Sequence, residues 1–356
     1  MLIDDAKTIA RLDSGNVRAS IDALPDQIAA AWSEAQEVSV PASYREADQI
    51  VVCGMGGSSL PSHLINSVYG RALRVPFSFF NGYELPGSVG RHSLVIVSSY
   101  SGTTEETLAC FKAAKARHAK IIGITSGGPL AKMLKKEKAP AYIFKPTFNP
   151  CGQPRLGLGY MTAGLLGLLN SVQDFGLDID ELEGIPKMLR GFHNRWAPAV
   201  PSSENAAKLM AHALYGTVPI IISAEHLAGN GHIMQNQIHE CAKQFSVAFQ
   251  LPELNHHLME GLALPDEIHR LLAPVFIDSE LYAERIARRI KVTQKVLAKQ
   301  GYGFNLYQAT APTPLGQAFE TVAFGSWVSF YMAIQNRIDP SNIPWVDFFK
   351  KELGRG

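Results

Sequence analysis

Two short apolar runs, each ending in a loop rich in glycine and hydroxyl side chains, constrain the fold of this chain most. Residues 50–54 lead into the loop GMGGSS, residues 94–98 lead into SSYSGTTEE, and a helical pattern follows each loop. Residues 121–125 repeat the arrangement, and residues 142–144 predict a fourth strand. Short apolar strands that alternate with helices are typical of a parallel sheet that is buried on both faces. The first half of the chain is therefore predicted to be an α/β lobe.

The second half of the chain shows the same alternation without such loops. Strands are predicted at 218–223, 274–278 and 303–307, and helices at 232–243, 281–300 and 315–337. Between the halves, the charge-free run 156–172 is shorter than the ~20 residues that span a bilayer, so it predicts a buried helix. Residues 178–201 resemble a linker that contains one helix. Because 356 residues are long for one domain, we expect two, 1–177 and 178–356.

Composition narrows the classes of partner and cofactor. With 46% apolar and 18% charged residues and a net charge of +1, the sequence predicts a globular protein that binds neither nucleic acid nor a membrane. Its four cysteines form no CxxC pair, so neither a zinc site nor a disulfide framework is expected. The N-terminal residues lack the basic and apolar segments of a signal peptide, which favours a cytoplasmic location. We expect no metal and no cofactor.

The two polar loops have the composition of a phosphate-binding site. Glycines let the backbone approach an anion, and hydroxyl groups and helix N-terminal N–H groups can bond to phosphate oxygens. For a single loop a turn with a helix cap is the simpler interpretation, but two such loops on successive strands favour an anion site. Neither loop carries the ATP-binding GxxxxGK[ST] motif, and Ser59 replaces the third glycine of the NAD-binding GxGxxG motif. The predicted phosphate ligands are Gly56, Gly57, Ser58, Ser99, Ser101 and Thr104.

Together these motifs resemble a known family. GMGGSS and SSYSGTTEET resemble the SIS domain, which binds phosphorylated sugars through serines and threonines. PRLGLGY at 154–160, NQIHE at 236–240 and LPELNH at 251–256 resemble segments of the bifunctional phosphoglucose/phosphomannose isomerases, and IDP at 338–340 with VDFFK at 346–350 fits as well. The resemblance covers nearly the whole chain in order. It implies two SIS-like, doubly wound (flavodoxin-like) parallel-sheet lobes. It also implies an enzyme that interconverts glucose 6-phosphate, mannose 6-phosphate or both with fructose 6-phosphate through a cis-enediol.

The same resemblance assigns four catalytic residues. Aldose–ketose isomerisation needs a ring opener, a base that moves a proton between C2 and C1, and a cation that stabilises the enediolate. Glu240 matches the family's base, and Arg155 supplies the cation. His256 matches the histidine that assists ring opening and reaches into the partner subunit's site, although His257 is chemically equivalent. Lys350 matches the near-terminal lysine, with Lys351 as the alternative.

Several other interpretations of the sequence stay open. From the residues alone, Glu240 is more often a solvated helix residue and Arg155 an ordinary linker residue. A sensor that binds a sugar phosphate without turnover, or an amino-sugar phosphate isomerase, would carry similar loops. A zinc enzyme is disfavoured because HECAK ends in Lys243, where the HExxH motif needs histidine. We expect a homodimer with a sugar 6-phosphate substrate, and the apolar helix 315–334 offers surface for the dimer to bury.

Overall fold

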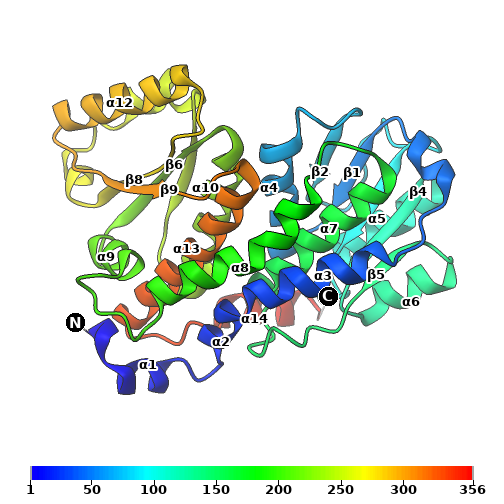
Figure 1. Cartoon of the computed structure of the whole chain (residues 1–356), viewed down its shortest axis with the longest axis horizontal. Helices are drawn as coiled ribbons and strands as arrows, with labels where there is room; N and C mark the ends of the chain where they lie inside the picture. Colours follow the sequence, from blue (N-terminus) through cyan, green and yellow to red (C-terminus); the bar gives the residue numbers. More distant parts are fainter. Residues whose placement is uncertain (1, 355–356) are drawn as a thin grey trace.

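The computed structural model, which describes residues 2–354, contains two parallel sheets that form two α/β lobes (Figure 1). The strand order is β2-β1-β3-β4-β5 in the first sheet and β7-β6-β8-β9 in the second. All neighbouring strands are parallel. This confirms the predicted pair of doubly wound lobes.

The strands are β1 (Ile50–Cys53), β2 (Phe77–Phe80), β3 (Leu94–Ser98), β4 (Lys120–Thr125), β5 (Ala141–Ile143), β6 (Val218–Ala224), β7 (Val247–Leu251), β8 (Leu272–Ser279) and β9 (Asn305–Ala309). The helices of the first half are α1 (Ala6–Leu12), α2 (Val17–Asp22), α3 (Leu24–Gln36), α4 (Leu60–Tyr69), α5 (Glu105–Ala116), α6 (Gly128–Lys136) and α7 (Leu158–Val172). Those of the second half are α8 (Ile179–Trp196), α9 (Ala206–Ala213), α10 (Ala228–Gln237), α11 (Leu258–Gly261), α12 (Glu284–Lys299), α13 (Pro314–Gln335) and α14 (Pro344–Leu353).

The first sheet is covered on both faces, which is why its central strands are mostly apolar. Side chains alternate along a strand, so Ile50 and Val52 of β1 join the core formed with α3, α4 and α7. Val51 and Cys53 point to the other face and pack in a separate cluster with residues of α5 and α6. Because Cys53 is level with Val97 of β3, the loops that follow these two strands begin at the same edge of the sheet.

The segment 178–201 contains one helix, as predicted, but this helix packs against both lobes instead of serving only as a linker. α8 is a helix of 18 residues whose apolar side, including Leu182, Leu189 and Trp196, is buried. It contacts both α3 and α13, while α4 contacts α10, so one hydrophobic core runs through both lobes. The N-terminal residues also reach the second lobe, where the Asp4 carboxylate accepts a bond of 2.9 Å from Lys208 Nζ.

The long apolar helix also differs from its expected role. α13 is buried at every position from Leu315 to Ile334 within the single chain. It therefore cannot supply the subunit surface that the sequence prediction assigned to it. The helix α7, in contrast, is buried as predicted. Among residues 2–354, no helix is long and apolar enough to cross a membrane.

Candidate active site

The polar loops after β1, β3 and β4 interlock at the carboxyl edge of the first sheet. Gly102, in the loop after β3, has φ +68°, and a Cβ added to it would lie 1.9 Å from the carbonyl oxygen of Gly127. Ser126 Oγ, in the loop after β4, donates to the Tyr100 carbonyl at 2.7 Å. Only glycine fits at position 102, since both the left-handed backbone and the close approach exclude a side chain. The loops thus form one rigid edge.

Two of the predicted phosphate ligands hold these loops in shape. Ser58 Oγ is buried and accepts a bond of 2.8 Å from the backbone N–H of Tyr100, which joins the first loop to the second. Ser99 Oγ is also buried, accepts from Gly102 N at 3.1 Å and lies 2.9 Å from Thr104 Oγ1. Hydroxyl groups committed to such bonds position their neighbours and present little surface to a ligand.

The remaining predicted ligands lie at the accessible side of the same loops. Ser101 is exposed, and its Oγ lies 2.8 Å from Thr103 Oγ1. Gly56 is exposed with open space around it. Thr104 precedes α5, and its side chain caps none of the first N–H groups of that helix. Helix N-terminal N–H groups without a side-chain cap are suited to bind an anion.

Arg155 lies directly behind the first loop. A Cβ on Gly57 would be 3.2 Å from the backbone nitrogen of Arg155, so this glycine lets the turn Pro154–Leu156 pack against the loop. The Arg155 side chain is only 3% exposed. One guanidinium nitrogen donates to the carbonyls of Pro340 (2.9 Å) and Ser341 (2.7 Å). A buried guanidinium needs such partners, because burial of an unpaired charge is costly.

The other guanidinium nitrogen of Arg155 faces Glu240, at 3.5 Å from its Oε2, and also donates to Gln153 Oε1 at 3.0 Å. Glu240 lies on a π-helical turn (Ile238–Ala242) that follows α10, where a regular helix was predicted. Its side chain is 30% exposed. Such turns are frequent at functional sites. The structure thus pairs the predicted base with the predicted cation beside the phosphate loops, 85 residues apart in sequence.

Lys243 lies next to this cluster and was not among the predicted site residues. Its sequence position served only to exclude a zinc motif. In the structure its Nζ donates to the carbonyls of Asp339 (2.9 Å) and Cys241 (3.2 Å), next to the segment that binds Arg155. Burial lowers the pKa of Lys243 from its usual value. The signal in the sequence was its position three residues after Glu240, about one turn of helix.

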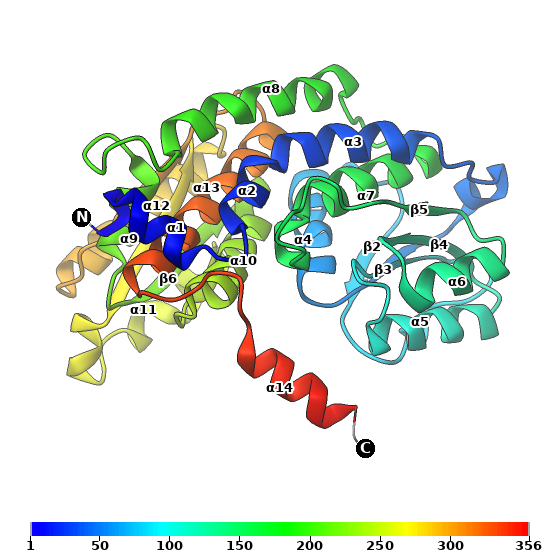
Figure 2. The same ribbon diagram turned by 90° about the horizontal axis from the view of Figure 1, so that it is seen from below.

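His256 and Lys350 lie elsewhere in the chain. His256 is exposed at the end of the turn Glu253–His256. Lys350 is exposed on α14, which extends away from the rest of the molecule in Figure 2. Among residues 2–354, neither side chain forms a hydrogen bond or ion pair with Arg155 or Glu240. Their catalytic roles stay predictions, and for His256 the expected place is the partner subunit's site.

Comparison with known proteins decides the family. Residues 43–136 match the SIS domain, and residues 203–353 match the bacterial phospho-glucose isomerase C-terminal SIS domain. The chain is 31% identical over 339 residues to the bifunctional phosphoglucose/phosphomannose isomerase of Caldicellulosiruptor bescii, covering 94% of this chain and 98% of that protein. It belongs to the bifunctional phosphoglucose/phosphomannose isomerase family. The chain is also 30% identical over 305 residues to the family member from Aquifex aeolicus. This match covers 85% of this chain and 90% of the Aquifex aeolicus protein.

Solved structures agree on the fold. A hypothetical protein from Thermus thermophilus superposes with a TM-score of 0.72 at 16% identity, covering 98% of this chain and 93% of that one.

The two family matches contain most of the predicted site residues. The SIS match contains both polar loops, and the match to the C-terminal domain contains Glu240, His256 and Lys350. The sensor and amino-sugar alternatives are not favoured, since both relatives described above are named as isomerases of this family.

Proposed function

We propose that this chain interconverts glucose 6-phosphate and mannose 6-phosphate with fructose 6-phosphate. The observation that supports this most is the Arg155–Glu240 pair, 3.5 Å apart beside a rigid edge of glycine and hydroxyl loops. The relatives named as bifunctional phosphoglucose/phosphomannose isomerases support the choice of both sugars. The cytoplasmic location and the homodimer belong to the same proposal. The four cysteines form no disulfide bonds, which supports the cytoplasmic location.

In the proposed mechanism each group has one role. Ser101, Thr104 and the N–H groups at the start of α5 bind the phosphate and so fix the position of the sugar. In the open-chain aldose, the Glu240 carboxylate takes the proton from C2, and the electron pair moves to form the C1–C2 double bond as O1 is protonated. Arg155 stabilises the negative charge that develops on the oxygens of this enediol. Glu240 then returns the proton to C1 while the O2 hydroxyl loses its proton and C2–O2 becomes the carbonyl of the ketose. The proton lost from O2 balances the proton gained by O1. Both aldoses lose the C2 proton to give the same enediol, so one carboxylate serves both, provided that the sugar rotates about the C2–C3 bond in the site.

A coupled assay tests the function directly. Glucose 6-phosphate and mannose 6-phosphate are supplied in turn, and fructose 6-phosphate is detected. We expect turnover with each. Among residues 2–354 there is no group of three or more His, Cys, Asp or Glu that could hold a metal ion. We therefore expect the rates to persist in the presence of EDTA, and a loss restored by zinc would contradict the metal-free mechanism.

The phosphate loops provide a first mutational prediction. Ser101→Ala and Thr104→Val should each weaken fructose 6-phosphate binding by about 10- to 100-fold, because each removes a hydrogen bond to a charged group. Isothermal titration calorimetry measures this. Ser39→Ala, an exposed serine after α3, is the matched control and should bind normally. Unchanged binding in both loop variants would place the phosphate elsewhere.

The homodimer provides a second prediction. α14 exposes Trp345 (81%), Phe348 (59%) and Phe349 (63%), an apolar surface that a second copy can cover. If His256 completes the partner's site, Glu240→Gln and His256→Ala should each be inactive alone. After unfolding and refolding together, the mixture should regain about one quarter of wild-type activity, because half of the dimers then carry one intact site of two. Light scattering checks the dimer, and a fully active monomer would contradict it.

A further inference from the structure

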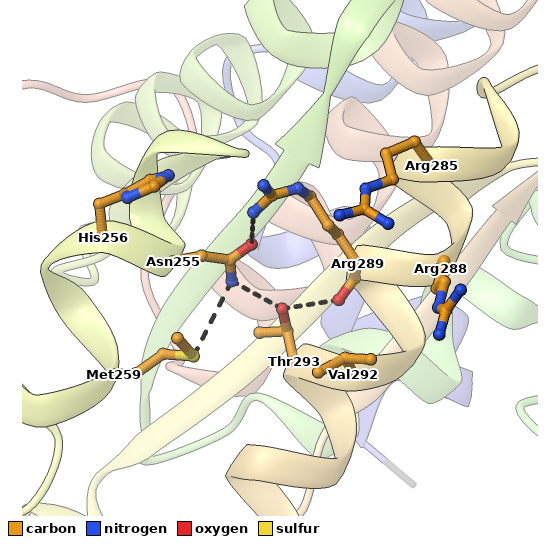
Figure 3. Close-up of a pocket in the computed structure, with 8 residues that line it drawn as sticks. All are labelled: Asn255, His256, Met259, Arg285, Arg288, Arg289, Val292 and Thr293. Atoms are coloured by element: carbon orange, nitrogen blue, oxygen red, sulfur yellow. Dashed lines mark hydrogen bonds between the residues drawn. The ribbon is translucent and has the colours of Figure 1, made fainter.

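A second concentration of charge lies on elements that carry neither Arg155 nor Glu240. A pocket with a volume of about 400 Å³ opens between the turn Glu253–His256, with α11 after it, and the first half of α12 (Figure 3). His256 and Asn255 lie on one side of the pocket, Arg285 and Arg288 on the other, and Arg289 between them. Its polar lining consists of Asn255, His256, Arg285, Arg288, Arg289 and Thr293.

The positive charge of this pocket has no counter-charge. No carboxylate lines the pocket, and within residues 2–354 none of the three arginines forms an ion pair. Positions 285, 288 and 289 share one helix face, so the three like charges repel one another, and Glu284 in the first turn of α12 forms no ion pair with them among the described residues. An anion held between them would remove that repulsion. A bound anion would therefore stabilise the folded protein.

Hydrogen bonds hold one of the three arginines, Arg289, in place. Arg289 donates to Asn255 Oδ1 at 3.1 Å, and Asn255 Nδ2 donates to Thr293 Oγ1 at 2.8 Å. Thr293 is buried and donates to the Arg289 carbonyl at 2.8 Å, which closes the network. This bonding orients the guanidinium beforehand and lowers the entropy lost when a ligand binds. The pocket is therefore a partly preorganised anion receptor.

We propose that this pocket binds a small organic phosphate that carries two anionic groups, either two phosphates or a phosphate and a carboxylate. A guanidinium matches phosphate and carboxylate oxygens with two parallel hydrogen bonds. Three guanidinium groups carry three positive charges, whereas a monoester phosphate carries about −1.5 to −2, so a second anionic group would complete the charge balance. The pocket volume suits a compound of sugar size. Such a ligand would contact His256, so inhibition of turnover would follow, a consequence that rests on the proposed function.

Titration with inorganic pyrophosphate tests the site. The Arg285→Ala/Arg288→Ala double variant should bind pyrophosphate about 10- to 100-fold more weakly than wild type. Lys291→Ala/Lys295→Ala is the matched control, because it removes two exposed lysines from the same helix outside the pocket. It should bind like wild type. All of these titrations are made in a Ser101→Ala/Thr104→Val background, so that the loops proposed to bind the sugar phosphate contribute little to the pyrophosphate signal. Thermal unfolding confirms that each variant is folded.

Three results would overturn the proposal. The arginine variant could bind pyrophosphate normally, or the lysine variant could lose as much affinity, which would indicate general attraction to a basic helix. Wild type could fail to bind pyrophosphate while the arginine variant alone loses self-association in light scattering, which would assign the pocket to an acidic surface of a second copy. A chain without isomerase activity would contradict the proposed function, while the titration would still decide the anion site.

Discussion

Replacing Glu240 with glutamine should lower kcat for both aldose 6-phosphates by about 10²–10⁴-fold, because the amide cannot accept the C2 proton. The amide oxygen can still accept from the Arg155 guanidinium, which lies 3.5 Å from Glu240 Oε2 in the native chain, so the site should keep its shape. The phosphate loops are unaffected. The loss should therefore appear in kcat, while the affinity for fructose 6-phosphate stays near normal.

Steady-state rates with each sugar and calorimetry with fructose 6-phosphate measure these two quantities. Solvent-proton exchange into fructose 6-phosphate should fall by a similar factor, since it uses the same proton transfer. Glu280→Gln, an exposed glutamate after β8, is the control and should have wild-type rates. A Glu240→Gln variant with near-normal turnover of either sugar would remove this residue as the base.

Replacing Arg155 with methionine should lower both stability and turnover. It leaves the carbonyls of Pro340 and Ser341 without their donor and Glu240 without its cation. Leaving a buried acceptor without its donor typically costs about 1–3 kcal/mol of the free energy of unfolding, and two carbonyls are affected here. Loss of the group that stabilises the enediolate should in addition lower kcat by about 10²–10³-fold.

Urea denaturation and steady-state kinetics separate the two effects. Arg155→Lys keeps the charge without the planar fork, so it should fold more stably than Arg155→Met and still turn over slowly. Arg190→Met is the matched control, because it removes an ion pair with Asp26 in which both side chains are well exposed. That change should cost about 0–1 kcal/mol. An Arg155→Met chain with normal stability and normal rates would show that the guanidinium serves neither purpose.

The local sequence was sufficient to predict a strand or helix where nearly all of its side chains are buried. β1 and β3 are buried on both faces, so β1 and the first four residues of β3 are apolar, and both strands were predicted within a residue. α7 is buried all round and was recognised by its lack of charge. β2 and β7 were missed, because they are edge strands whose residues are mostly half-buried and leave no continuous apolar signal.

Sequence by itself determined the class of this protein: two parallel α/β lobes, with glycine and hydroxyl loops at strand ends, and Glu240 and Arg155 as the residues to consider. The lobes and their loops follow from short-range patterns, since a strand, a loop and a helix start are encoded within a few residues. Glu240 and Arg155 were assigned by the family resemblance of the segments around them. Only the tertiary structure decided that α13 is buried inside the chain while α14 is exposed. It also showed that the Ser58 and Ser99 hydroxyl groups accept hydrogen bonds from backbone N–H groups of the loops. It also placed Arg155 against carbonyls 185 and 186 residues away. Such contacts depend on how separate elements pack, which no local pattern records.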